Sequence, residues 1–252
     1  MVGSESAPGP ESVALVTGAT SGIGSDVARQ LLEAGLIVHV AGRDLQRLDA
    51  AMREFAGYGD AAQPLLLDVT DAESIAAAAA AVHDLDVLVN NAGINPGGAN
   101  AIEAQLDDFR RTYETNVFAV VAVTAAFVPA LRRSAHPRIV NVSSGTASLS
   151  WSTSDNPQFD WRAVQGGGTA YRSSKTALNA VTLHTAQALA AEGSHAKVNA
   201  LAPGLRRTNL ISGMTRGGDP AEAAAGVVRL ALLPDDGPTG GFFSWDGTPV
   251  PW

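Results

Sequence analysis

Residues 13–24 read VALVTGATSGIG, and this stretch decides the fold. Four apolar residues predict a buried strand, and the glycine-rich turn after them opens a helix. Backbone N–H groups and the helix dipole at such a start favour a phosphate, and glycines let the backbone approach it closely. The glycine spacing differs from the common G-x-G-x-x-G pattern, and a lone glycine cluster is more often a plain turn. The position between strand and helix nevertheless favours a nucleotide site.

The same alternation of strand and helix continues along the chain. Short apolar runs rich in β-branched residues alternate with longer helical segments, which indicates a parallel sheet with helices on both faces. The predicted strands are residues 13–16, 37–41, 64–67, 86–89, 138–142, 197–201 and 241–244. The predicted helices are residues 23–34, 45–53, 72–83, 106–132, 170–191 and 221–232. The expected fold is therefore α/β, a Rossmann-type doubly wound parallel sheet.

Length and composition favour one domain. A chain of 252 residues, of which 46% are hydrophobic, is long enough for one substantial core. Residues 1–12 contain Gly, Ser, Pro and Glu without a basic start or an apolar segment, so we expect a disordered N-terminal tail and no signal peptide. Residues 13–252 are then expected to form the single domain.

The charge and the residue types exclude several classes of partner. The formal net charge of -8 argues against binding to nucleic acid or to an anionic membrane, because the electrostatic contribution would be repulsive. The chain has no cysteine, and no cluster of His, Asp and Glu suggests a metal site. No uncharged apolar run stands out as long enough to cross a bilayer, so we expect a cytoplasmic protein that binds small molecules.

The loop after the second predicted strand indicates the cofactor. Ligands of open α/β sheets bind at the carboxyl ends of the strands, and an acidic residue there binds the 2'-hydroxyl of NAD. The chain instead reads Ala41-Gly42-Arg43, and a guanidinium can pair with the 2'-phosphate of NADP. We therefore predict NADP(H), with Ser21 as a second contact. The alternative is that Arg43 is a surface residue paired with Asp44.

Two further loops lie at the same predicted edge of the sheet. Asp68, just past the third strand, is placed to accept a hydrogen bond from the adenine amino group; alternatively, beside Thr70, it caps the next helix. Asn91, Ala92 and Gly93 follow the fourth strand. A tight turn of small residues there lets the backbone pass under the adenosine ribose, although a plain turn has the same sequence.

Tyr171 and Lys175 are candidates for the chemistry. Four residues is about one helical turn, so the phenol and the ammonium lie on the same face, where the positive charge is expected to lower the phenol pKa. An isolated pair of this kind is usually solvated and contributes little. The order of motifs favours catalysis: the glycine-rich turn, an Asn-Asn-Ala-Gly turn, a strand ending in Ser143-Ser144, and then this pair.

Together these residues resemble the classical short-chain dehydrogenase/reductase family. The resemblance runs from about Ser12 to about Gly247. The motifs that carry it are residues 17–24, residues 90–93, Asn116, Ser144, Tyr171 with Lys175, and Pro203-Gly204. As a set they are specific for the family, but they indicate little about the substrate.

The resemblance implies a role for each catalytic candidate. Tyr171 is implied to be the general acid/base, and Lys175 to lower its pKa and bind the nicotinamide ribose. Ser144 matches the serine that hydrogen-bonds the substrate oxygen. Asn116 matches the asparagine that holds a water beside the lysine; alternatively, it is a polar residue that bonds neighbouring backbone.

The resemblance also completes the cofactor site. The loop at Pro203, Gly204 and Thr208 matches the one that positions the nicotinamide carboxamide. The residues expected to bind the cofactor are Gly18, Thr20, Ser21, Gly22, Ile23, Gly24, Arg43, Asp68, Val69, Asn91, Ala92, Gly93, Tyr171, Lys175, Pro203, Gly204 and Thr208. Arg206 and Arg207, in the same loop, either meet an acidic substrate group or are solvated.

Residues 150–168 depart from the simple family pattern. The interval from Ser144 to Tyr171 is longer than in simple members and resembles the insertion of carbonyl-reductase-like members. Ser144 and Tyr171 are expected to contact the substrate, as are Trp151, Phe159 and Trp161, which would form an apolar lid at its entrance. Alternatively, these aromatic residues pack the loop onto its own surface.

The resulting expectation is an NADP(H)-dependent carbonyl reductase or alcohol dehydrogenase that acts on a ketone, aldehyde or secondary alcohol. Two alternatives stay open: a reductase of C=C or C=N bonds, or a cyclase, on the same fold; and a sensor that binds NADP without catalysis. The family implies a homodimer or homotetramer through the long helices around Asn116 and after Tyr171, whereas the insertion would favour a monomer.

Overall fold

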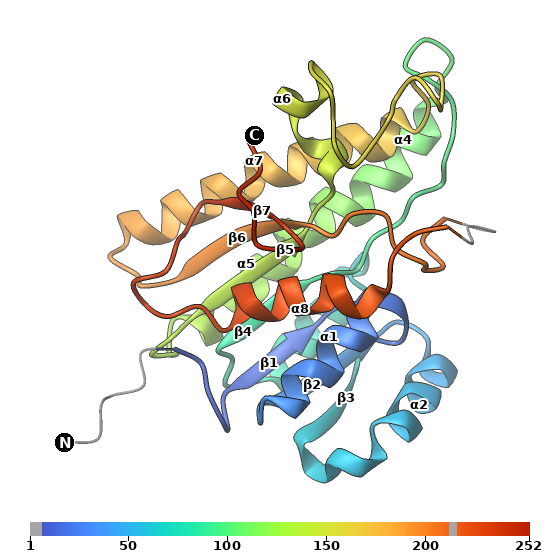
Figure 1. Ribbon diagram of the computed structural model, residues 1–252. Helices are drawn as coiled ribbons and strands as arrows, with labels where there is room; N and C mark the ends of the chain where they lie inside the picture. The colour runs from blue at the N-terminus through green and yellow to red at the C-terminus, as the bar shows by residue number, and fades with distance from the viewer. Residues whose placement is uncertain (1–6, 212–215) are drawn as a thin grey trace.

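The computed structural model describes residues 7–211 and 216–252. Within these residues one parallel sheet forms the centre of the molecule, with strands in the order β3-β2-β1-β4-β5-β6-β7 (Figure 1). The strands are β1 (Val13–Val16), β2 (Ile37–Gly42), β3 (Ala62–Leu66), β4 (Val87–Asn90), β5 (Arg138–Val142), β6 (Lys197–Ala202) and β7 (Phe242–Ser244). The predicted Rossmann-type doubly wound sheet is thereby confirmed.

Helices cover both faces of the sheet. The α-helices are α1 (Gly22–Glu33), α2 (Leu45–Glu54), α3 (Ala72–Ala81), α4 (Leu106–Tyr113), α5 (Ala119–Leu131), α6 (Leu149–Ser152), α7 (Thr169–Ala191) and α8 (Pro220–Ala231). The other helical turns are η1 (Ala56–Ala61), η2 (Glu114–Phe118) and η3 (Gly145–Ala147). One face packs against α1, α2 and α8, and the other against α3, α5 and α7.

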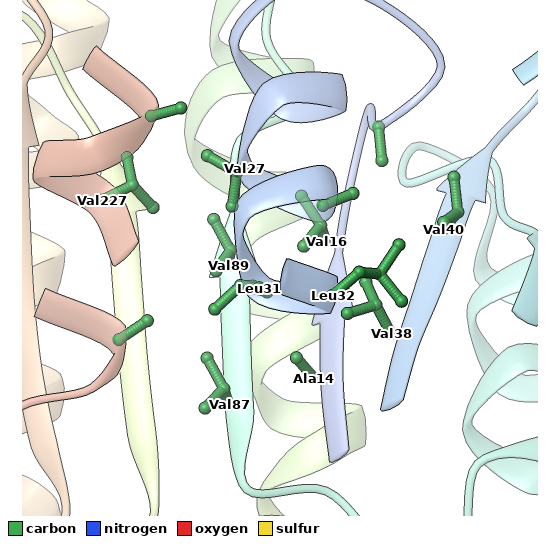
Figure 2. Packing of buried hydrophobic residues seen from close by; sticks show 14 of the residues in the cluster. Ala14, Val16, Val27, Leu31, Leu32, Val38, Val40, Val87, Val89 and Val227 are labelled. Carbon is green, nitrogen blue, oxygen red and sulfur yellow. The ribbon is translucent and has the colours of Figure 1, made fainter. Parts of the chain in front are cut away.

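The alternation of side chains along each strand builds two hydrophobic cores. In β1, Ala14 and Val16 point toward α1 and α8, and Leu15 points to the opposite core. Figure 2 shows the first core, in which Val27 of α1 and Val227 of α8 meet the strand residues. Both cores are fully enclosed, so the strands read as continuous apolar runs, as expected for a sheet covered on both faces.

The order of the strands fixes the position of the site. The chain runs outward from β1 to β2 and β3, then returns to β4 on the other side of β1. The chain therefore leaves β1 and β4 in opposite directions along the sheet, and open α/β sheets bind their ligands at the carboxyl edge of such a switch point.

Two predicted elements differ in detail. The predicted third strand begins at Ala62 instead of Pro64, and Pro64 pairs with Val40. A proline is compatible with this position because β3 lies at the edge of the sheet. The single helix expected over residues 106–132 is divided by the π-helical turn η2, in which the Ala119 N–H bonds to the Glu114 carbonyl.

The start of the domain lies earlier than the sequence indicated. Disorder was expected over residues 1–12, and residues 1–6 lie outside the described residues. Residues 7–12 are instead attached to the domain. The Glu11 N–H donates to the Gly35 carbonyl at 3.0 Å, and the Ser12 carbonyl accepts from the Ile37 N–H. These bonds fix the segment that leads into β1.

One helical stretch is long and apolar enough to cross a membrane, which the sequence reading had not found. It comprises Leu106–Leu131 and has a mean hydropathy of 1.6 in its most apolar window. Half of that window is buried inside the protein, where Val123 and Phe127 pack in the second core. This is the pattern of a helix that packs on a sheet.

Candidate active site

The loops after β1 and β4 are joined by Thr17. Its side-chain oxygen accepts hydrogen bonds from the N–H groups of Asn91 and Ala92, both at 3.0 Å, and donates to the Val89 carbonyl at 3.3 Å. The Asn91 amide in turn donates to the carbonyls of Thr17 and Gly18. Thr17 was not predicted to have a role of its own. The one feature of the sequence that could have indicated it is a hydroxyl directly after a buried strand.

The contacts of Thr17 lead to a stability prediction. In Thr17→Val, the Ala92 N–H loses this acceptor, whereas the Asn91 N–H keeps the Val89 carbonyl at 3.1 Å. We therefore expect the free energy of unfolding to fall by about 1 kcal/mol. Thr17→Ser, which keeps the hydroxyl, is the control in urea unfolding. An equal loss in both variants would contradict the role of the hydroxyl.

The glycines predicted to approach a phosphate form a tightly packed cradle. Gly18 has a φ of +64°, and a Cβ there would lie 3.0 Å from the Ala92 Cα. A Cβ on Gly24 would collide with the Gly18 carbonyl and the Asn91 amide. Gly22 has a φ of +58° and faces the Thr208 methyl, so this loop and the loop after β6 meet. Only glycine permits this close approach.

The N-terminus of α1 is free to bind an anion. Ser21 stands at the N-cap, but its side chain makes no capping hydrogen bond, and the first turn contains no acidic residue. Thr20 packs toward Gly42, and Ile23 packs against the first core. The cradle and the uncapped helix together fit a dinucleotide pyrophosphate.

At the end of β2, a side chain in place of Gly42, such as the acidic residue that would bind NAD, would require Thr20 to move. A Cβ on Gly42 would lie 2.5 Å from the Thr20 methyl. Arg43 is exposed, and within residues 7–211 and 216–252 it forms no ion pair. Asp44 is instead the N-cap of α2 and accepts from the Arg47 N–H at 2.9 Å. The alternative pairing of Arg43 with Asp44 is therefore not seen.

Asp68 lies at the same edge and does not cap the following helix. Its carboxylate accepts from the Thr70 N–H at 2.9 Å and from the Thr70 hydroxyl at 2.7 Å, and these bonds, with help from the charge of Arg43, lower its pKa. Asp71 is the N-cap of α3. Asp68 therefore stays ionised and keeps its second oxygen for another donor.

A small pocket lies beside Asp68, between the ends of β1 and β4. It is lined by Val69, Ala92, Thr115 and Val120, among other residues. Val69 and Ala92 were expected near the cofactor, whereas Thr115 was not. Thr115 lies on η2, far along the chain, so only the folded sheet reveals that it borders the same pocket.

Ser144, Tyr171 and Lys175 come together at the end of β5. Tyr171 and Lys175 lie in the first turns of α7, with the ammonium 5.8 Å from the phenol ring centroid. The Ser144 side chain lies close enough to the Tyr171 phenol to influence its pKa, and the Ser144 oxygen lies 2.9 Å from the Thr146 hydroxyl. The Lys175 ammonium donates to the Val142 carbonyl at 2.8 Å.

The pKa values of this pair correct one expectation. Burial raises the pKa of Tyr171 to about 12, an effect that the Ser144 side chain only partly opposes, and burial lowers the pKa of Lys175 to about 8. The expected net lowering of the phenol pKa is therefore wrong for the protein alone, because desolvation disfavours the charged forms of both groups and dominates. At neutral pH Tyr171 is a protonated donor.

Asn116 lies under this group, in the π-helical turn η2. Its amide donates to the Ile94 carbonyl at 2.9 Å and to the Ser174 hydroxyl at 3.0 Å, and it accepts from the Ile94 N–H. A Cβ on Gly93 would lie 3.2 Å from the Asn116 oxygen and 3.5 Å from the Lys175 ammonium. The backbone-bonding alternative is thus seen, and Gly93 leaves space where these two side chains converge.

The loop after β6 is held in place by Arg206. Arg206 is only 7% exposed, and its side chain donates to the Pro203 carbonyl at 2.6 Å and pairs with Glu222. Its guanidinium lies 4.3 Å over the Trp245 ring, which also faces Gly204. Arg206 is therefore a structural clamp and does not meet a substrate. Arg207 is exposed and donates to the Gly217 carbonyl at 3.0 Å.

The three aromatic residues of the insertion have different surroundings. Trp151, on α6, packs against a small core cluster, which agrees with the packing alternative. Phe159 lies under the Arg172 guanidinium, at 5.0 Å. Trp161 is 37% exposed and lies under Arg162, at 4.6 Å. The insertion is thus not a purely apolar lid.

Known proteins share both the sequence and the fold. The sequence model of the short chain dehydrogenase family matches residues 12–156. A short-chain dehydrogenase, anuI, from Penicillium roqueforti is 35% identical over 86% of this chain and 87% of its own. Salutaridine reductase from Papaver bracteatum is 30% identical over 91% and 93%, respectively.

A solved structure agrees over nearly the whole chain. NADPH-bound carbonyl reductase from chicken fatty liver superposes with a TM-score of 0.83 at 29% identity, covering 97% of this chain and all of that one. The protein belongs to the classical short-chain dehydrogenase/reductase family. It is an oxidoreductase of the class that uses a nicotinamide cofactor and binds a small-molecule substrate.

Proposed function

We propose that this protein is an NADP(H)-dependent carbonyl reductase, which in reverse oxidises a secondary alcohol. The observation that carries the proposal is the convergence of Ser144, Tyr171 and Lys175 at the carboxyl edge of the sheet, beside the glycine cradle. A ketone or aldehyde oxygen is the group that two neighbouring hydroxyl donors would bind.

The proposed cofactor site consists of the glycine cradle and the loops after β2 and β3. The cradle of Gly18, Gly22 and Gly24 would hold the pyrophosphate, with Asp68 at the adenine and Arg43 at the 2'-phosphate. When bound, the nicotinamide supplies or accepts the hydride. The name of the NADPH-bound chicken carbonyl reductase supports the same cofactor.

The remaining predicted cofactor contacts are proposed to surround these groups. Val69 and Ala92 border the pocket beside the adenine, and Thr208 touches Gly22 of the cradle. The other proposed contacts are Thr20, Ser21, Ile23, Asn91, Gly93, Pro203 and Gly204.

Two hydroxyl groups act on the substrate oxygen in this proposal. Ser144 donates a hydrogen bond to the oxygen as negative charge develops on it. Tyr171, protonated at neutral pH, gives its proton to that oxygen and becomes a phenolate; with the hydride that a bound nicotinamide would supply to the carbon, the carbonyl becomes an alcohol. In the oxidative direction the phenolate takes the proton back.

Lys175 and Asn116 serve the phenolate. The positive charge of Lys175, 5.8 Å from the ring centroid, stabilises the phenolate only while the lysine is protonated. Gly93 leaves space between Lys175 and the Asn116 oxygen, and we place a relay water there that returns a proton to Tyr171. Asn116 acts as a positioning residue because its amide is fixed to Ile94 and Ser174.

The pKa values predict the pH profile of the reduction. Tyr171, with a pKa of about 12, stays protonated, whereas Lys175, with a pKa of about 8, loses its charge as the pH rises through that value. We expect kcat/KM for reduction to be flat below about pH 8 and to fall about tenfold per unit above it. A profile that rises above this pH would contradict the role of charged Lys175.

The direct test is NADPH oxidation with a panel of ketones, aldehydes and quinones. Turnover that disappears in Tyr171→Phe would support the proposal and identify the class of carbonyl. NADPH binding without turnover of any carbonyl would favour a reductase of C=C or C=N bonds. Binding that Tyr171→Phe leaves unchanged, with no turnover of any substrate class, would favour a sensor.

We also propose self-association through the long helices. Leu106, Phe118 and Val121 are large apolar residues on the α4–α5 stretch, and each is more than 45% exposed. Large exposed apolar side chains on one helical stretch favour an interface there. Size-exclusion chromatography with light scattering distinguishes a dimer or tetramer from a monomer, the state that the insertion would favour.

A further inference from the structure

The guanidinium of Arg172 is a partly buried cation with few partners. Arg172 follows Tyr171 in the first turn of α7, and its guanidinium lies 5.0 Å over the Phe159 ring of the insertion. Among the described residues the guanidinium makes one long hydrogen bond, 3.4 Å from Nη1 to the Gly166 carbonyl, and its buried Nε has no partner there. The side chain is therefore fixed on an aromatic face with donor capacity left over.

No acidic group of the described chain neutralises this charge. In residues 7–211 and 216–252 no carboxylate lies within ion-pair distance of Arg172, although acidic residues outnumber basic ones overall. Burial lowers the pKa of Arg172, which reports the cost of holding the charge there. An anion from outside the chain would offset that cost.

The acidic residues near the insertion are directed elsewhere. Asp155 and Asp160 are exposed, and Asp160 accepts from the Arg162 N–H at 2.9 Å. Asp108 of α4 pairs with Arg111 at 2.7 Å. An anion that binds Arg172 would therefore not have to displace a carboxylate from it.

The stack of Arg172 on Phe159 joins the helix that carries Tyr171 to a segment that packs against the residue after Ser144. Arg172 is the sequence neighbour of Tyr171. On the other side, Phe159 follows Gln158, whose side chain packs against Gly145, the residue after Ser144. Gln158 is fixed there because its amide donates to the Ser244 hydroxyl at 2.9 Å. Arg172 is thus one residue from Tyr171 along α7, and its aromatic partner belongs to the segment that packs against the residue after Ser144.

We infer that Arg172 is a specificity-determining residue that binds a carboxylate on the carbonyl substrate, so that the preferred substrates are keto acids. The planar guanidinium fork matches a carboxylate with two parallel hydrogen bonds. The face of Phe159 offers apolar contact to the chain that links carboxylate and carbonyl. This inference rests on the proposed carbonyl reductase activity and adds the substrate class to it.

The test compares aryl keto acids of increasing chain length, each paired with its methyl ester, in NADPH-dependent reduction. We expect at least one acid to exceed its ester in kcat/KM by about tenfold in the wild type. Arg172→Met should abolish that preference by lowering turnover of the acid alone. Arg172→Lys, a point charge without the fork, should recover only part of it. Arg162→Met, which removes the arginine stacked on Trp161 of the insertion, should change the turnover of neither substrate.

The outcomes separate this inference from the function on which it rests. Unchanged ester turnover in Arg172→Met would show that the variant is folded and active. Equal activity of wild type on acids and esters, or an equal loss of both in Arg172→Met, would overturn the inference while leaving the reductase intact. Absence of turnover with every carbonyl would overturn the proposed function, and the inference with it.

Discussion

Replacing Tyr171 with phenylalanine is expected to lower kcat for carbonyl reduction by about 10²- to 10⁴-fold, the range that general acid catalysis contributes. The variant removes one oxygen and keeps the ring, which is buried at the start of α7. The phenol is the protonated donor at neutral pH, so its loss leaves Ser144 to stabilise a developing negative charge without a proton to quench it. NADPH affinity should change by no more than about twofold, because Lys175 stays anchored to the Val142 carbonyl.

A matched control for this prediction is Tyr58→Phe. Tyr58 lies on η1, which precedes the edge strand β3. Its hydroxyl makes a long hydrogen bond to Glu33, at 3.4 Å. Its kinetic constants should equal those of the wild type. Single-turnover kinetics with preformed NADPH complex would locate the loss in the chemical step. If Tyr171→Phe kept more than about a tenth of the wild-type kcat, the phenol could not be the proton donor.

The elements that sequence reasoning located are those with a local signal. Short apolar runs between helical segments predicted every strand of the described sheet to within a few residues. Such runs are continuous because the sheet is buried on both faces. The glycine loop and the pair of Tyr171 and Lys175 were equally visible. Each of these signals depends on neighbours close in the chain.

The parts that escaped the sequence reading depend on contacts between distant segments. Thr17 meets Asn91 across 74 residues, and Thr115 borders the pocket only because η2 crosses the end of β4. Arg206 looked like a solvent-facing arginine, yet the Trp245 ring and Glu222 bury it. The pKa of Tyr171 was misjudged for the same reason: spacing on a helix gives the neighbour, but only the packed structure gives the desolvation.

Replacing Arg43 with alanine is expected to raise the KM for NADPH by about 100-fold and to leave the KM for NADH within about twofold. Charge-assisted hydrogen bonds are worth about 1.5–3 kcal/mol each, and the 2'-phosphate is the one group that NADH lacks. Arg43 is exposed, and its removal breaks no ion pair of the described chain. The neighbouring Gly42 has no side chain that could take over this contact.

Arg47→Ala is the control for Arg43→Ala, since Arg47 is an exposed arginine on the first turn of α2 that donates its backbone N–H to Asp44. It should leave both constants unchanged, which would exclude a general effect of surface charge. The loss in Arg43→Ala should also shrink at high salt, because an exposed ion pair with phosphate is screened. Equal KM values for NADPH and NADH in the wild type, or equal losses in Arg43→Ala, would mean that Arg43 does not select the phosphate and that the cofactor preference lies elsewhere in the loop.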